Sequence, residues 1–158
     1  MNGTVLAYLA GAIDSDGTIG IKRSTYSIRV KKDSVNPMFS ERVALRQVTP
    51  QIPELLKRVF GGCIYMTKPT AAKGRPLYSW AVTDMKAVAC VTALLPFLKV
   101  KRKQAVNCIA LRRTKESSKK AKVAFGRGHA GAAPRPQRLT DRMESLYANA
   151  KHLNAVGI

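Results

Sequence analysis

The chain has 158 residues, enough for one domain with a substantial core and too few for two of comfortable size. Apolar residues make up 46% of it, which excludes a wholly disordered protein. Its 28 Lys and Arg against 9 Asp and Glu give a net charge of +19, which repels itself unless a polyanion neutralises it. Nucleic acid is therefore the leading partner, ahead of an anionic membrane, because no separate basic amphipathic helix stands out.

The first part of the chain predicts a helix followed by a strand. Residues 4–13 are apolar with small residues, Thr4 is suited to the N-cap, and Gly17 ends the segment with a turn. Residues 18–23 then alternate apolar and polar as a half-buried strand does. The alternation changes phase before Ile28, which indicates a bulge or turn around residues 24–27.

The next segment predicts a loop, a strand and a helix. Residues 33–39 contain Asn36-Pro37 and are expected to form a loop. Residues 42–48 follow as a strand with arginines on one face, and Thr49-Pro50 is typical of an N-cap and first helical turn. That helix is expected to stop at Gly61-Gly62.

The remaining chain predicts two strands and three helices. The strands are residues 63–68 and 77–82, and the helices are about 84–95, 100–114 and 140–153. Residues 116–138 are rich in Lys, Arg, Gly, Ala and Pro and are interpreted as a basic, poorly packed arm. We therefore divide the domain into a core of residues 1–115 and an appended arm and helix of residues 116–158.

Three widely spaced cysteines, Cys63, Cys90 and Cys108, form no C-x-x-C pair and indicate neither a zinc site nor a disulfide framework. They are interpreted as reduced thiols of an intracellular protein, in the cytoplasm or an organelle. The N-terminal apolar run is too short to span a bilayer and no basic region precedes it, so secretion and membrane insertion are not expected.

Strands that arrive in hairpin pairs with helices between them predict an α+β domain, with one antiparallel sheet covered by helices on one side. Tyr78, Trp80 and Val82 share the face expected to meet the helices, which leaves Ser79 on the open face. A basic open face suits a DNA groove. The candidate DNA-binding residues are Lys22, Arg23, Arg29, Lys31, Arg42, Arg46, Lys68, Lys73, Arg75 and Ser79.

The stretch from Leu9 to Gly17 reads Leu-Ala-Gly-Ala-Ile-Asp-Ser-Asp-Gly. Its two carboxylates, Asp14 and Asp16, follow an apolar helix at the end where the backbone dipole is negative, so a compensating cation is expected, with a divalent metal the obvious candidate. A calcium loop is excluded by spacing, because the twelfth position counted from Asp14 is Thr25 and not a bidentate Glu.

This stretch resembles the signature of the LAGLIDADG homing endonucleases. The segment from Pro96 to Ala105 resembles that family's Leu-x-x-Lys-x-x-Gln-Ala segment, and the element order αββαββα is that of its core. The resemblance covers most of residues 4–114. It implies an intron-type homing endonuclease that binds a long, roughly palindromic double-stranded DNA site and hydrolyses both strands, with no small-molecule substrate.

Only one copy of the motif is found, so the resemblance implies a homodimer whose motif helices lie side by side. Ala7, Ala10 and Gly11 are the small residues expected at that contact, although they could instead face their own sheet. Asp14 is assigned either to this interface or to hydrogen bonding within the turn.

The resemblance assigns Asp16 as the catalytic metal ligand, aided by the Ser15 carbonyl. Mg²⁺ is the expected ion, with Mn²⁺ tolerated and Ca²⁺ bound without supporting cleavage. Lys101, or the neighbouring Lys99, would activate water or stabilise charge on the phosphate, the alternative being an ordinary solvated lysine. Gln47 and Gln51 are the candidate catalytic glutamines, because Pro50 occupies the position that matches the family's glutamine.

Two other functions remain open from the sequence. One is a non-cleaving nucleic-acid binder of the same fold, either an RNA maturase or a repurposed DNA-binding protein. The other is a basic structural protein with a chance motif.

Overall fold

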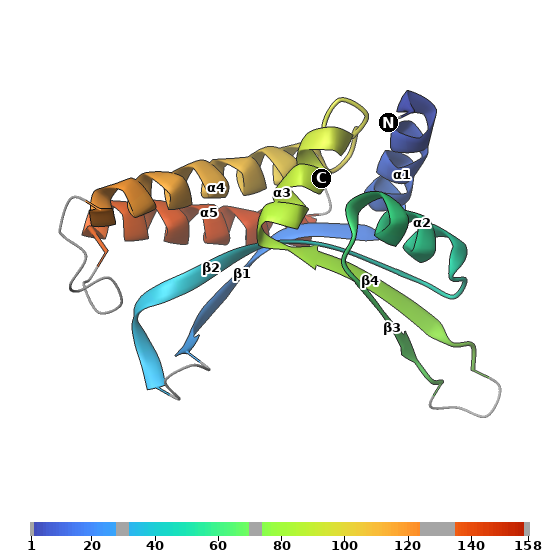
Figure 1. Ribbon diagram of the computed structural model, residues 1–158, viewed down its shortest axis with the longest axis horizontal. Coiled ribbons are helices and arrows are strands. Elements are labelled where there is room, and N and C mark those ends of the chain that lie inside the picture. The colour runs from blue at the N-terminus through green and yellow to red at the C-terminus, as the bar shows by residue number, and fades with distance from the viewer. Residues whose placement is uncertain (1, 28–31, 70–73, 124–134, 157–158) are drawn as a thin grey trace.

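The computed structural model describes residues 2–27, 32–69, 74–123 and 135–156. Its four strands form one antiparallel sheet in the order β1-β2-β4-β3, and the helices cover one side of it (Figure 1). The predicted α+β class and the αββαββα order are therefore confirmed. The elements are α1 (Gly3–Asp16), β1 (Gly17–Ser27), β2 (Lys32–Gln47), α2 (Gln51–Phe60), β3 (Cys63–Thr67), β4 (Leu77–Thr83), α3 (Asp84–Leu94), α4 (Arg102–Val123) and α5 (Gln137–Val156).

The two hairpins, β1–β2 and β3–β4, meet where β2 pairs with β4 and then curve away from the helices as the two sides of an arch (Figure 1). At the centre of the sheet, Leu45 lies opposite Gly17 on one side and Trp80 on the other. Alternate residues of β2 point to opposite faces, so Val43 and Leu45 enter the core while Arg42 and Arg46 face the open side.

Trp80 is fully buried, and its indole Nε1 donates to the Gly61 carbonyl oxygen at 2.9 Å. This confirms it as a core residue. The turn that precedes β3 requires glycine: Gly62 has a φ of 93°, and a Cβ built there would lie 2.6 Å from the Ala81 oxygen. The predicted end of α2 at this glycine pair is confirmed.

Helix starts were predicted less accurately. The side chain of Asn2, not Thr4, accepts from the Thr4 amide and caps α1. Pro50, not Thr49, occupies the N-cap position of α2, where no side chain provides a capping hydrogen bond. Thr83 holds the N-cap position of α3, where no side chain provides a capping hydrogen bond, and the neighbouring Asp84 carboxylate accepts from Lys115 Nζ.

Residues 33–39 are not a loop, because β2 runs continuously from Lys32 to Gln47. The expected irregularity is nevertheless present, as a shift in the β1–β2 register between Ser24 and Tyr26. Pro37 lies opposite that shift and outside the part of β2 that pairs with β4, so its missing N–H breaks no regular ladder.

The basic segment after residue 115 also differs from expectation. Helix α4 continues to Val123, since Lys, Ala and Glu are strong helix formers. Residues 124–134 lie outside the described part of the chain, and α5 begins at Gln137. Asn107 Nδ2, on α4, donates to the Leu146 carbonyl oxygen of α5 at 2.8 Å, so this helix pair is joined by hydrogen bonds as well as apolar packing.

Cys90 and Cys108 are buried and unpaired, and burial raises the pKa of each thiol to about 12. They therefore stay protonated at neutral pH, as is typical of buried structural cysteines, whereas Cys63 is exposed. None of the helices among the described residues has the length and hydrophobicity needed to cross a bilayer.

A charged cluster ties the sheet to the helices. Glu41 lies on the helix-facing side of β2 with no exposed surface, and its Oε2 accepts from Arg112 Nη2 at 2.7 Å and from Lys115 Nζ at 2.9 Å. Lys115 also donates to Asp84 Oδ1 at 3.0 Å, which joins β2, α3 and α4. Buried charges of this kind are tolerated only when they are paired.

We expect Glu41→Gln to lower the free energy of unfolding by about 3 kcal/mol, because it leaves the buried Arg112 without its closest countercharge. Urea denaturation would measure the loss. The matched control is Glu116→Gln on the exposed side of α4, expected to change stability by no more than about 0.5 kcal/mol. Equal effects of the two substitutions would contradict the assigned role of Glu41.

Candidate nucleic-acid interface and acidic centre

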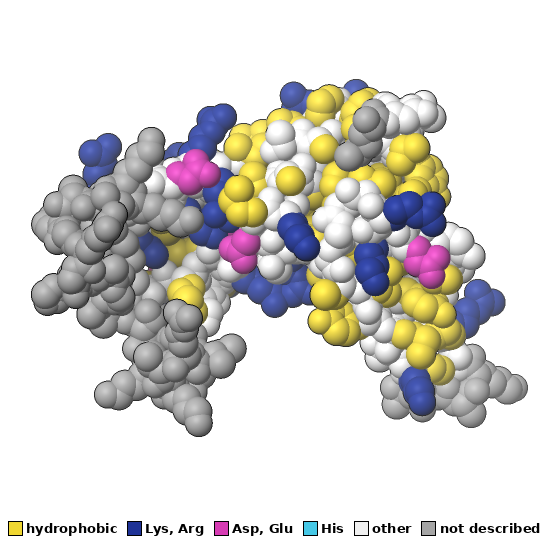
Figure 2. Space-filling view, viewed as in Figure 1, with side chains coloured by type: hydrophobic (Ala, Val, Ile, Leu, Met, Phe, Trp, Pro, Cys, Tyr) yellow, Lys and Arg dark blue, Asp and Glu magenta, His cyan; other side chains and the backbone are white. Residues whose placement is uncertain are grey.

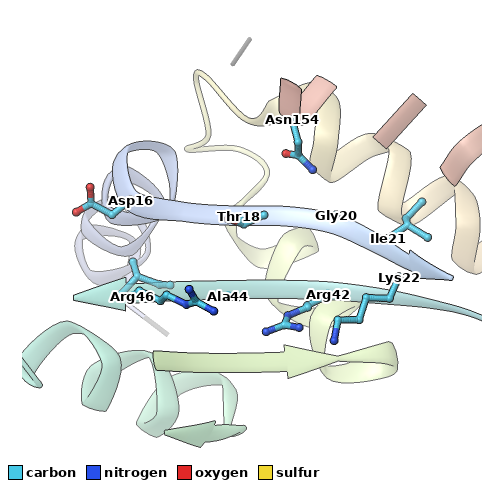
Figure 3. Close-up of a pocket in the computed structure, with 10 residues that line it drawn as sticks. Asp16, Thr18, Gly20, Ile21, Lys22, Arg42, Ala44, Arg46 and Asn154 are labelled. Carbon is cyan, nitrogen blue, oxygen red and sulfur yellow. The ribbon is translucent and has the colours of Figure 1, made fainter. Parts of the chain in front are cut away.

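The open face of the sheet carries a basic hollow of ≈ 460 Å³ under the arch. Lys22, Arg42 and Arg46 extend from adjacent strands on the same side of the sheet (Figure 3). Figure 2 shows dark-blue Lys and Arg side chains gathered between the two hairpins. Asp16 lies at one end of this hollow, where α1 passes into β1 (Figure 3).

The structure separates the candidate DNA-binding residues into groups. Ser79 is paired with Arg46 across the β2–β4 ladder, at the centre of the sheet. Lys68 and Arg75 are exposed beside the ends of β3 and β4. Arg29, Lys31 and Lys73 lie outside the described residues.

Arg23 differs from the expectation of an open-face residue. It follows the buried Ile19 and Ile21 on the helix side of β1, and its Nε donates to Glu144 Oε1 of α5 at 2.7 Å. The alternation along β1 was visible in the sequence, but the partner on α5 was not.

The Asp16 carboxylate is exposed and holds one hydrogen bond. Gln47 Nε2, at the end of β2, donates to Asp16 Oδ2 at 2.9 Å. No described residue donates to Oδ1, so that oxygen remains open to an external ligand. Of the two candidate glutamines, the structure brings Gln47 to Asp16, whereas Gln51 begins α2 as an exposed residue.

Asp14 is fully engaged inside the chain. Its Oδ2 accepts from the amides of Lys99 at 2.7 Å and Val100 at 3.2 Å, and its Oδ1 accepts from the Lys101 amide at 2.8 Å. Three successive N–H groups thus converge on one carboxylate immediately before α4. This supports the interpretation of Asp14 as a residue that organises a turn.

Lys101 returns the contact. Its Nζ donates to the carbonyl oxygens of Ile13, at 2.9 Å, and Asp14, and lies 3.4 Å from that of Ser15. Burial lowers the pKa of this ammonium group, while the charges of Asp14 and Asp16 oppose the shift. Lys99, the alternative lysine, has an exposed side chain and contacts Asp14 only through its backbone. We call this reciprocal contact between Asp14 and residues 99–101 the α1 clasp.

The α1 clasp changes the argument that two acids at a helix C-terminus require a metal. The carbonyl oxygens at the end of α1 already accept hydrogen bonds from the charged Lys101 ammonium group, and backbone N–H groups already stabilise the Asp14 carboxylate. Of these two acids, only Asp16 has a carboxylate oxygen that receives no hydrogen bond from the described residues. Within the described residues, no three His, Cys, Asp or Glu side chains come together as a possible metal site.

One side of α1 faces solvent. Tyr8 is 55% exposed, and Ala7 and Gly11 lie on the same stripe at helical spacing. A Cβ built on Gly11 would meet no atom within 4 Å. Ala10, in contrast, is fully buried against the chain's own core, so it does not share the exposed stripe of Ala7 and Gly11.

Two polar residues of the hollow were not found from the sequence. Thr18 lies on the open side of β1 with Gly20 and Lys22, and the two-residue period could have identified it. Asn154 comes from the far end of α5, and its Nδ2 donates to the Ile19 carbonyl oxygen at 3.1 Å. No local pattern indicates that contact.

No family model matches the chain, and no curated protein matches it in sequence. Solved structures do match. The homing endonuclease I-CvuI, crystallised with the I-CreI target, has a TM-score of 0.58 at 18% identity, covering 96% of this chain and 93% of its own. The archaeal intron-encoded homing endonuclease I-Vdi141I, complexed with DNA, has a TM-score of 0.56 at 14% identity, covering 95% and 96%.

A third match carries the family name. The LAGLIDADG homing endonuclease I-GzeII, in complex with its DNA target, has a TM-score of 0.55 at 11% identity and covers 90% of this chain but 43% of its own longer chain. The chain has the LAGLIDADG homing endonuclease fold. The nine-residue motif forms the second half of α1 and the first residue of β1, so Asp14 and Asp16 belong to the last turn of the helix, which extends beyond the predicted residues 4–13.

We expect Asp14→Asn to lower the free energy of unfolding by about 2 kcal/mol, because its amide group would oppose backbone N–H donors that now face a carboxylate. Urea denaturation would measure this loss. Asp16→Asn is the control and should change stability by less than about 0.5 kcal/mol, since Asp16 is exposed. A larger loss for Asp16→Asn than for Asp14→Asn would refute the division of roles between the two acids.

Proposed function

We propose that this protein is a site-specific, metal-dependent DNA endonuclease that acts as a homodimer. One observation carries the proposal: the open Asp16 carboxylate lies where the basic hollow of the sheet meets the C-terminal end of α1, whose small-residue stripe is exposed. An acid with a free oxygen beside a surface suited to phosphates supports metal-assisted phosphodiester hydrolysis.

The sheet supports binding to double-stranded DNA. Lys22, Arg42 and Arg46 lie on neighbouring strands of a curved, antiparallel surface whose hairpins extend to either side. Strands of this kind enter the major groove, where arginine can donate to guanine and any cation can contact phosphate. The DNA complexes of I-Vdi141I and I-GzeII, which share the fold, support the same assignment.

The residues at the end of α1 fit a divalent ion whose ligands come partly from this chain and partly from DNA, water and a second chain. Asp16 Oδ1 receives no hydrogen bond from the described residues, and one carboxylate per chain leaves most ligand positions for phosphate oxygens, water and a second chain. Mg²⁺ accepts such a ligand set. When bound, it would stabilise the attacking and leaving oxygens of an in-line displacement.

The neighbouring residues have positioning roles in this proposal. Gln47 fixes the orientation of Asp16 through Oδ2, and so leaves Oδ1 directed to the ligand. Lys101 holds the end of α1 through the Ile13 and Asp14 carbonyls, and the Ser15 carbonyl at 3.4 Å is the one it engages least. That oxygen therefore remains the backbone candidate for a second metal contact.

The exposed stripe of α1 supports the homodimer. Helices approach closely where their contact residues are small, and Gly11 and Ala7 provide such a surface without any role in the chain's own packing. Two copies joined along α1 would bring two Asp16 carboxylates toward the centre of a continuous basic sheet surface.

A non-cleaving DNA or RNA binder of this fold is the second candidate. It is favoured by the commitment of the Lys101 ammonium to backbone carbonyls and by Pro50, which replaces a glutamine at the position matching the family's pattern. The basic sheet face is common to both candidates, so cleavage decides between them.

Asp16→Asn should reduce cleavage at least roughly 1,000-fold, equivalent to about 4 kcal/mol of activation free energy, because the amide is a poor metal ligand. The substrate is a duplex selected by binding from a randomised library, and the assay measures strand cleavage with Mg²⁺ and with Ca²⁺. DNA affinity should stay within a few-fold.

Asp141→Asn, an exposed acid on α5, is the matched control and should cleave like the wild type. Cleavage that survives in Asp16→Asn would refute the catalytic assignment. Tight, sequence-specific binding by the wild type without cleavage in Mg²⁺ or Mn²⁺ would favour the non-cleaving binder.

Gly11→Leu should weaken self-association at least tenfold while leaving the protomer as stable as before, because no atom of its own chain lies within 4 Å of the added Cβ. Leucine also has the higher helix propensity, by up to about 1 kcal/mol. Sedimentation equilibrium measures the dissociation constant of the dimer, and urea denaturation measures the stability of the protomer. The control is Ala148→Leu, at an exposed small residue of α5. If Gly11→Leu associates as tightly as the wild type, α1 is excluded as the interface.

A further inference from the structure

A second basic surface lies in the helix layer, between α4 and α5. It is a hollow of ≈ 630 Å³ whose lining includes Arg113 of α4 and Arg138 and Arg142 of α5. We call it the α4–α5 basic groove. The helices cover one face of the sheet and the hairpins curve away from them, so this groove is separate from the hollow under the arch (Figure 1).

No acidic side chain of the described residues lines the α4–α5 basic groove. Among the described residues, none of its three arginines forms an ion pair, whereas Arg112 and Lys115 of the same helix are both paired with Glu41. The hydroxyls of Thr114 and Ser117 donate to carbonyl oxygens of α4. The donors available to a ligand are therefore the guanidinium groups and the Ser145 hydroxyl, and the ligand they suit is an anion.

The arrangement of the arginines is unfavourable without such a ligand. Arg138 and Arg142 are one turn apart on α5, where like charges destabilise a helix, and Arg113 adds a third charge from α4. Planar guanidinium groups match the two oxygens of a phosphate. An anion in the groove would remove the repulsion and supply the missing hydrogen-bond acceptors.

The positive charge extends along the helix pair beyond this groove. Arg102 and Lys103 line a second hollow between the same helices, of ≈ 380 Å³, with Asn149 opposite them. Residues 103 and 113 are ten positions apart on α4, which corresponds to roughly 15 Å along its axis, or about four nucleotides of one strand at 3.4 Å each. A charged polymer matches this length better than a single phosphate ion does.

We propose that the α4–α5 basic groove binds the phosphodiester backbone of a second nucleic-acid segment, separate from the duplex assigned to the open sheet face. The inference does not depend on DNA cleavage, because it rests on the charge and shape of the helix layer. It also accounts for arginines that the sheet face does not use. DNA and RNA both offer this backbone, and the test distinguishes them.

The test uses the full chain with Arg113, Arg138 and Arg142 all replaced by Gln. Fluorescence anisotropy measures binding to a DNA duplex and to an RNA duplex, each of random sequence and about 20 base pairs, over a range of KCl concentrations. Loss of three phosphate contacts should flatten the slope of log affinity against log salt by about 2.7 for the segment bound in the groove. A flatter slope with DNA, with RNA or with both identifies the source of the backbone.

The control carries K57Q, R58Q and K86Q, which remove the same charge from exposed positions on α2 and α3. It separates contact in the groove from a general loss of positive charge, and its slope should change by less than 1. Equal slopes for the two triple variants on both duplexes would overturn the proposal. If the groove variant fails to fold, R138Q with R142Q against K57Q with R58Q gives the same comparison, with an expected change of about 1.8.

The two proposals fail in different ways. If the groove variant loses nucleic-acid binding but still cleaves DNA, the endonuclease assignment stands, because Asp16 and the basic hollow lie under the arch. If the two surfaces are independent, the Asp16→Asn variant should still bind nucleic acid in the α4–α5 basic groove, whatever its effect on cleavage.

Discussion

The arrangement of the site depends on the α1 clasp, in which two chain segments satisfy each other's backbone groups. A helix C-terminus leaves carbonyl oxygens without partners, and the turn before a helix leaves N–H groups without partners. Lys101 supplies the donor for the first, and Asp14 supplies the acceptor for the second. Because the two contacts are reciprocal, the end of α1 is fixed against residues 99–101, and Asp16 is held at the edge of the sheet.

This contact also explains why two acids only two residues apart have different chemistry. Both oxygens of Asp14 already accept hydrogen bonds from backbone N–H groups, so this carboxylate is not directed to an external ligand. Asp16 lies beyond the end of the Lys101 contact, and Gln47 occupies only one of its oxygens. Their difference comes from the partners that the fold provides, since both residues are aspartates.

The sequence predicted those features that depend on local pattern. Alternation identified β1 and β4 and assigned Trp80 to the core, and the glycine pair after Phe60 marked the end of α2. The sequence-based predictions failed where the local structure depends on residues that are distant in the chain. Asn36-Pro37 indicated a loop, but a register shift in β1 lets β2 continue through it. The pairing of Arg23 with Glu144 and the contact of Lys101 with the α1 carbonyls join residues more than 80 positions apart, and neither leaves a local signal.

The distribution of acids gives the net charge its structural meaning. Glu41 and Asp84 face Arg112 and Lys115 between the sheet and the helices, and Glu144 faces Arg23 between β1 and α5. These three acids join separate elements of the fold, and the buried Arg112 would be strongly unfavourable without its pair. Among the described residues, the cations under the arch and those of the α4–α5 basic groove form no ion pair. A protein with this division of charge is more stable when a polyanion covers those surfaces, because binding relieves repulsion between cations that no acid of the described chain pairs with.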